Sequence, residues 1–130
     1  MVKATRRGEP YCVAVSNGRV ELHADTHKNG QGGAAGMRPH ELLESALAAC
    51  VCISIEMAAA RAGVSVPKPT VEVHVERSDE ATCFRVAVHC EAPLAEAARE
   101  IVLAAVAQSP VAQTLGRAVR VELGAVGADT

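Results

Sequence analysis

The stretch Pro39-His40-Glu41-Leu42-Leu43-Glu44-Ser45-Ala46-Leu47-Ala48-Ala49-Cys50 decides how the chain folds. Proline is favoured at the first position of a helix, and Glu41 and Glu44 lie where the positive end of the helix dipole is felt. From residue 46 to residue 55 the side chains are apolar or small on every side, which is typical of a buried helix. We therefore predict a buried helix from Pro39 to about Ala62.

Two β-type segments precede this helix. Residues 11–16 and 19–24 flank Asn17-Gly18, which is the strongest short signal for a β-hairpin. A glycine-rich stretch runs from Asp25 to Arg38. We expect this stretch to be a loop that does not pack as an element, of the length that often carries function.

The segments after the helix predict the rest of the fold. Residues 70–77 alternate between apolar and polar, as in a strand with one wet face, and residues 82–90 are expected to pair with them in antiparallel fashion. Pro93 is expected to start a second helix, which Pro110 breaks before a short restart. Residues 118–123 are predicted to form a last strand. The order ββ-α-ββ-α-β indicates an α+β fold, with helices on one face of a mainly antiparallel sheet.

Length and composition favour a single domain that is completed by a second copy. A chain of 130 residues predicts one domain over 1–130, with residues 1–9 and 124–130 as loose ends. Tyr11 and Phe84 are the only aromatic residues, so the core must consist of smaller Ala, Val, Leu and Ile side chains. Because a small domain with such a core is marginal alone, we expect a homodimer.

Charge and hydropathy exclude several classes of partner. The net charge is −2 and no basic stripe occurs, so we expect no nucleic-acid partner. The longest apolar run, Ala46 to Ile53, is too short to span a bilayer, and no signal peptide precedes it. We therefore expect no membrane association and a cytoplasmic location. There the five cysteines, an odd number without CxxC spacing, should be mostly free thiols.

A bound cofactor or metal is not expected. Gly30-Gln31-Gly32-Gly33-Ala34-Ala35 fits the G-x-G-x-x-A pattern of a dinucleotide-binding loop, but the predicted helix begins several residues too late. His23 and His27 flank Asp25, yet the chain has nothing with the spacing of a zinc site. We expect neither group in this protein.

Two motifs resemble those of the OsmC/Ohr family. The first is Gly32-Gly33…Gly36-x-x-Pro39-His40-Glu41-Leu42-Leu43…Ala46-Leu47-Ala48-Ala49-Cys50, preceded by Asp25. The second, Ser109-Pro110-Val111-Ala112-Gln113-Thr114-Leu115, is similar to the family's Cys-Pro-Val-x-x-Thr-Leu. The order of elements fits along almost the whole chain. The resemblance implies an intertwined homodimer with two active sites at the subunit interface.

The resemblance also implies roles for individual residues. Cys50 takes the position of the peroxidatic cysteine, whose thiol attacks organic or hydrogen peroxide. An arginine and a glutamate tune that thiol in the family. Glu41 is the glutamate of the OsmC-like branch, since His40 occupies the slot used by the organic-hydroperoxide branch, and Arg19 and Arg38 are the candidate arginines.

Ser109 is a departure from the family pattern, because it stands where the resolving cysteine would be. A serine cannot form a disulfide, so an oxidised Cys50 needs an external thiol or another cysteine of the chain. Cys52 points to the opposite face of the predicted helix. Cys83 and Cys90 lie on a predicted strand, and Cys90 is the better of these two candidates for an alternative resolver, since it ends the strand near a turn.

Each of these residues also has a plain structural interpretation. A free cysteine in an Ala/Leu helix more often serves as a small packed hydrophobe than as a nucleophile. Ser109 before Pro110 is the expected N-cap of a helix. Glu41 in a first turn can simply complement the helix dipole.

The sequence therefore leaves two functions open. The first is thiol-dependent reduction of peroxides by Cys50 with an external thiol reductant, and the apolar side chains around it favour organic peroxides (Leu43, Ala46, Leu47, Ile53 and Met57). The second is a non-catalytic member of the fold that binds a small apolar or thiol-bearing ligand at the dimer interface.

Overall fold

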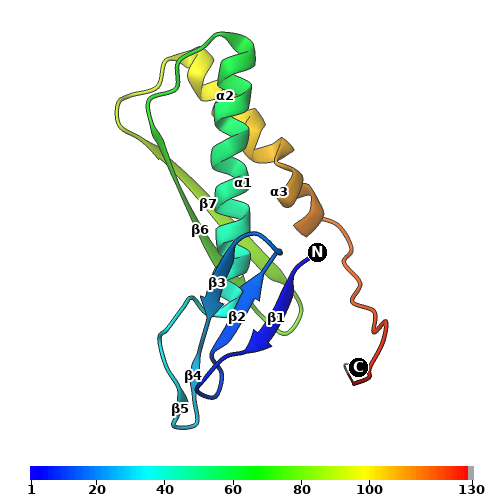
Figure 1. The fold of residues 1–130 in the computed structure, drawn as a ribbon. Coiled ribbons are helices and arrows are strands. Elements are labelled where there is room, and N and C mark those ends of the chain that lie inside the picture. Colours follow the sequence, from blue (N-terminus) through cyan, green and yellow to red (C-terminus); the bar gives the residue numbers. More distant parts are fainter. Residues whose placement is uncertain (129–130) are drawn as a thin grey trace. The chain divides into compact units, whose positions relative to one another are not determined.

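The computed structural model describes residues 1–128, and these form an α+β fold, as predicted (Figure 1). The helices are α1 (Pro39–Ala62), α2 (Glu96–Gln108) and α3 (Pro110–Leu115). The strands are β1 (Lys3–Arg6), β2 (Val13–Ser16), β3 (Glu21–Ala24), β4 (His27–Lys28), β5 (Gln31–Gly32), β6 (Pro69–Arg77) and β7 (Thr82–Cys90).

The chain divides into two compact units that alternate along the sequence. The first unit contains Met1–Ala48 and Glu72–Ala87, and the second contains Ala49–Val71 together with the chain from Val88 onward. The helix α1 and the strands β6 and β7 each continue from one unit into the other. The expected single domain over 1–130 stays a prediction.

The N-terminal part of the first unit is an antiparallel sheet with the strand order β1-β2-β3. The hairpin predicted at Asn17-Gly18 is present, but its turn spans the four residues 17–20 instead of two, because Ser16 pairs with Glu21. Gly18 has a φ of 93°, and the Asn17 Oδ1 accepts the N–H groups of Arg19 and Val20, both at 2.9 Å. The expectation that residues 1–9 are loose is wrong for β1. Its four residues pair with β2 in a register that runs from Lys3 opposite Ser16.

The glycine-rich stretch is more ordered than expected, because it contains the small β4-β5 hairpin and is organised by Asp25. This buried carboxylate accepts the N–H groups of Thr26 at 2.8 Å, Gly33 at 3.3 Å and Ala35 at 3.1 Å. The Ala35 N–H, followed by those of Thr26 and Gly33, lowers the pKa of Asp25 against the opposing effect of desolvation. The Gly33 and Ala35 N–H groups, which a phosphate bound in a dinucleotide loop would need, already donate to Asp25. This argues against a dinucleotide-binding loop.

The central helix α1 has the predicted bounds but not the predicted burial. Leu47, Val51 and Ile55 recur every four residues and are only 3%, 0% and 0% exposed, so they form its buried stripe. Ile53 and Met57, by contrast, are 55% and 56% exposed. The helix is therefore covered on one face instead of all round. By length and composition α1 would also pass as a membrane span, a test that core helices of soluble proteins pass too.

The remaining elements follow the sequence up to the C-terminus. β6 and β7 form a two-stranded sheet joined by a short turn, in which Ser78 N–H donates to the Ala81 carbonyl at 2.9 Å. α2 begins at Glu96, three residues after the predicted start at Pro93. The last strand predicted at 118–123 is wrong: this segment has no regular structure in the described chain. A strand needs a hydrogen-bonded neighbour, and the segment's apolar side chains are instead exposed.

Candidate functional site

Cys50 and Ser109 meet in the second unit, although 59 residues separate them in the sequence. Cys50 is half-buried on α1, and Ser109 is completely buried at the junction of α2 and α3. The Ser109 hydroxyl donates a hydrogen bond to the Cys50 Sγ over 3.0 Å. The structure thus brings together the two residues that the family motifs singled out.

The chain places Ser109 by ending one helix and starting another. A residue before proline is driven out of the helical region, and Ser109 accordingly has φ −54° and ψ 127° between α2 and α3. Pro110 then occupies the first position of α3, where its missing N–H is harmless. The Ser109 Oγ accepts the Ala112 N–H at 3.4 Å, so the predicted N-cap is confirmed.

The surroundings of the Cys50 sulfur favour its thiolate. The Ser109 hydroxyl acts most strongly, and together with the Val111 N–H and the Ser54 hydroxyl it lowers the pKa of the Cys50 thiol below its ordinary value of 9.0. Burial opposes this effect, because removing water disfavours the charged form. A lowered pKa matters because the thiolate, not the thiol, is the nucleophile.

Two of these donors were missed by the sequence reasoning. Ser54 lies four residues after Cys50 on α1, and side chains at this spacing are neighbours on a helix surface, so the sequence carried a signal for it. Val111 carried no such signal. Its N–H is available because it lies in the first turn of α3, where the N–H groups have no helical partner.

The other candidate site residues are found in separate places. Arg38 and Glu41 pair in the first unit: Glu41 accepts the Arg38 backbone N–H at 2.9 Å and lies 3.4 Å from the Arg38 Nε. This arrangement caps α1, and the Arg38 N–H lowers the pKa of Glu41. Arg19 lies in the turn between β2 and β3. Cys90 is half-buried at the end of β7, and all five cysteines are free thiols.

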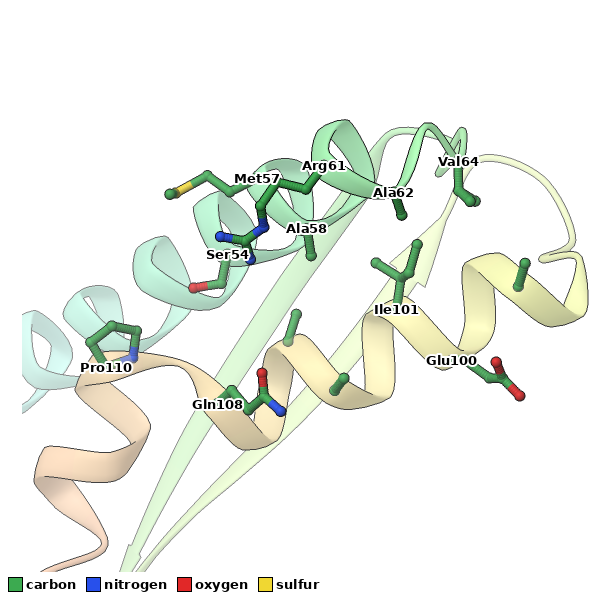
Figure 2. A pocket seen from close by; sticks show the side chains of 13 residues that line it. Ser54, Met57, Ala58, Arg61, Ala62, Val64, Glu100, Ile101, Gln108 and Pro110 are labelled. Carbon is green, nitrogen blue, oxygen red and sulfur yellow. The ribbon is translucent and has the colours of Figure 1, made fainter.

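An apolar pocket of about 550 Å³ lies beside the Cys50 site in the second unit. It opens between the C-terminal half of α1 and α2, and Figure 2 shows Ile101 pointing toward Ala62 and Val64 while Glu100 points away. Ser54 lines the pocket, and its hydroxyl is one of the donors to the Cys50 sulfur. Pro110, the residue after Ser109, lines it as well. Of the apolar side chains that we expected around the site, only Met57 lines it.

A metal site is a separate question. Within residues 1–128, no three His, Cys, Asp or Glu side chains cluster in a way that would hold a metal ion.

A cysteine on a long helix, contacted by the N-cap serine of a short helix on an α+β scaffold, makes this place a candidate thiol-based site. The model of the OsmC-like protein family matches residues 30–124, which include both motifs and all three helices. The chain belongs to the OsmC-like protein family. No curated protein sequence matches it.

Solved structures share the fold along most of the chain. An osmotic stress induced and detoxification response protein from Psychrobacter arcticus is 20% identical with a TM-score of 0.71, covering 87% of this chain and 85% of its own. The organic hydroperoxide resistance protein OhrB of Bacillus subtilis is 20% identical with a TM-score of 0.60, covering 88% and 87%. An organic hydroperoxide resistance protein from Vibrio cholerae, with captopril bound in one of its active sites, is 22% identical with a TM-score of 0.63, covering 88% and 83%.

Proposed function

We propose that this protein reduces organic hydroperoxides with Cys50 as the nucleophile and an external thiol as the reductant. The observation that carries the proposal is the set of hydrogen-bond donors around the Cys50 sulfur, led by the Ser109 hydroxyl at 3.0 Å. A structural cysteine in an apolar core has no need of such donors, whereas a peroxidatic thiolate does.

The proposed reaction has three balanced steps. The Cys50 thiolate attacks the terminal peroxide oxygen, which breaks the O–O bond and gives a sulfenic acid on Cys50 and an alcohol once a proton is taken up. An external thiol then attacks the sulfenic sulfur and releases water, which leaves a mixed disulfide. A second external thiol breaks this disulfide and regenerates Cys50, so two thiols are oxidised for each peroxide reduced.

The pocket supports an organic substrate over hydrogen peroxide. Its walls are mostly aliphatic, from residues such as Ala58, Ile101 and Ala104. Burying the carbon chain of a hydroperoxide there would contribute about 25 cal/mol for each Å² of apolar surface removed from water. Hydrogen peroxide offers no such surface.

The proposed active form is a homodimer in the cytoplasm. Apolar side chains are exposed on α1 and in the C-terminal segment, including Ile53 and Met57 on α1 and Val121 and Leu123 near the C-terminus. An interface with a second copy would bury such surfaces.

The proposed roles of the remaining residues follow the family pattern. Glu41 and one arginine, Arg38 or Arg19, are proposed to tune the Cys50 thiolate. The pairing of Arg38 with Glu41 at 3.4 Å favours Arg38 over Arg19. Cys90 is proposed as a resolver only if oxidation removes two thiols from the chain.

The test is consumption of cumene hydroperoxide with dithiothreitol as the reductant, by wild type and by Cys50→Ser. The wild type is expected to consume the peroxide, and Cys50→Ser is expected to lose this activity. After a stoichiometric pulse of peroxide without reductant, the intact mass of the wild type should show one added oxygen. The Cys52→Ser variant is the matched control, since it changes a half-buried cysteine on the same helix. Equal consumption by wild type and Cys50→Ser would refute the proposal.

The pocket also favours a second candidate function, which is binding of a small apolar ligand without catalysis. In that case Cys50 would remain a thiol after excess cumene hydroperoxide, and the mass of the protein would not change over minutes. The same pulse experiment therefore separates the two functions.

A further inference from the structure

We propose that Ser109 is a positioning residue for Cys50, which holds the sulfur and stabilises its thiolate by donating a buried hydrogen bond. The family pattern places a resolving cysteine at this position, and a hydroxyl cannot take over that role. The inference rests on the proposed nucleophilic role of Cys50. It assigns to Ser109 a task that helix capping alone does not explain.

The direction of the hydrogen bonds carries the argument. A serine hydroxyl has one proton to donate and lone pairs that accept. The Ser109 oxygen accepts the Ala112 N–H at 3.4 Å, so one lone pair faces the first turn of α3. The proton is thereby left for the Cys50 sulfur at 3.0 Å, which is the shorter of the two contacts.

Burial strengthens this contact. Ser109 is 0% exposed, so water does not compete for its hydroxyl. The backbone on both sides is fixed, because the Gln113 N–H donates to the Ser109 carbonyl at 2.9 Å and Pro110 restricts the residue before it. The donor is thus already in place before the sulfur becomes charged, which is the condition for electrostatic stabilisation without reorganisation.

The electrostatics of the site agree with this geometry. In the part of the chain that the structure describes, the groups that lower the Cys50 pKa are the Ser109 hydroxyl, the Val111 N–H and the Ser54 hydroxyl. None of them carries a charge or titrates near neutral pH. These three donors therefore add no titration of their own to the pH profile of Cys50 reactivity.

The experiment measures alkylation of Cys50 by iodoacetamide between pH 6 and pH 10, with the site read by peptide mass spectrometry. A Cys52→Ala background removes the second thiol of the same tryptic peptide. In Ser109→Ala, loss of a hydrogen bond to a charged group is expected to lower the thiolate fraction near pH 7 about tenfold. The thiolate of higher pKa is about threefold more nucleophilic, so the net rate falls about threefold near pH 7.

The two pH profiles are therefore expected to cross. Once the thiol is fully ionised, Ser109→Ala should react about threefold faster than wild type, because only the greater nucleophilicity remains. A merely structural role does not give a crossing: a more open site would raise both limbs of the profile. Profiles that coincide, or that move in the same direction at both ends, would overturn the inference.

Two further variants separate the hydroxyl from the helix cap. Ser109→Gly removes the hydroxyl but leaves a residue that is also well tolerated at an N-cap. It is expected to cross the wild-type profile as Ser109→Ala does, whereas Ser109→Thr keeps the hydroxyl and should follow wild type. A Gly profile that follows wild type would assign the effect to the cap and refute the proposal.

Failure of this inference can be told from failure of the proposed function, since alkylation needs no peroxide. Crossing profiles in a protein that does not consume cumene hydroperoxide would retain the role of Ser109 and remove the peroxidase function. Consumption of peroxide with coinciding profiles would do the reverse.

Discussion

Replacing Ser109 with cysteine is expected to give the chain an internal disulfide to Cys50 on exposure to peroxide. The Ser109 oxygen lies 3.0 Å from the Cys50 sulfur, whereas the two sulfurs of a disulfide lie about 2.05 Å apart. The side chain at position 109 already points at Cys50, so small rotations of the two side chains suffice to close the bond. The sulfenic acid on Cys50 would then be attacked by the new thiol instead of by an external one.

The stability gained follows from the separation of the two residues. They are 59 residues apart, and a disulfide that closes such a loop removes unfolded-chain entropy worth about 4 kcal/mol at 25 °C. With a urea dependence of about 2 kcal/mol per molar, the unfolding midpoint of the oxidised Ser109→Cys variant should exceed that of its reduced form by about 2 M. Strain in the bond would reduce this gain.

The assay is urea unfolding of oxidised and reduced Ser109→Cys, with intact mass and peptide mapping to locate the bond. The oxidised variant should be lighter by two hydrogens, with residues 50 and 109 in one cross-linked peptide. Wild type is the control, since the same oxidation should not give it this bond. Oxidation of the variant that leaves Cys50 as a sulfenic acid, with no link to position 109, would refute the juxtaposition of these side chains.

The remaining predictions concern assembly, core and loop. Light scattering should show a dimer, and Ile53→Glu on the exposed face of α1 should shift it to monomer; a monomeric wild type would contradict this. Ile55→Ala, at a fully buried position, should lower the free energy of unfolding by about 2–5 kcal/mol in chemical denaturation, and an unchanged midpoint would contradict the assigned core. The pKa of Asp25 lies below its ordinary 3.8, so its carboxylate stabilises the fold above that pH, and this contribution is lost as the pH falls through the folded pKa. In acid titrations of stability, Asp25→Asn should therefore lack the part of the loss that comes from protonating Asp25 in wild type.

Local patterns in the sequence were sufficient to predict most of the elements. The hairpin at Asn17-Gly18 depends on a local turn of residues 17–20, and the bounds of α1 depend on a proline at its start, so neither needs distant contacts. The N-cap at Ser109 is equally local. These are the features for which sequence reasoning is strongest.

The errors arose where structure depends on a neighbour. Residues 118–123 have the pattern of a strand but no regular structure in the described chain, and β1 was expected to be loose although β2 pairs with it. The burial of α1 is lower than the sequence predicts, because apolar composition does not show which face of the helix the rest of the chain covers. The role of Asp25 as the acceptor of three loop N–H groups was not predicted, since it depends on how the loop returns.

The family motifs indicate Cys50 and Ser109, but the contact between their side chains depends on how α1 and the α2–α3 junction pack. The sequence showed a serine in the place of a cysteine, and it could not show that the hydroxyl donates to the sulfur. Ser54 was in reach of sequence reasoning by its helical spacing, whereas Val111 and the pocket depend on how α2 and α3 lie beside α1.

The hydroxyl at position 109 makes oxidised Cys50 vulnerable to irreversible damage under the proposed chemistry. A neighbouring thiol would convert the sulfenic acid to a disulfide and so protect it from further oxidation, which a serine cannot do. External thiol and further peroxide then compete for one sulfur, and the second oxidation gives a sulfinic acid that ordinary thiols do not reverse. The ratio of reductant to peroxide in the cell would thus determine how many catalytic cycles each molecule completes before overoxidation inactivates it.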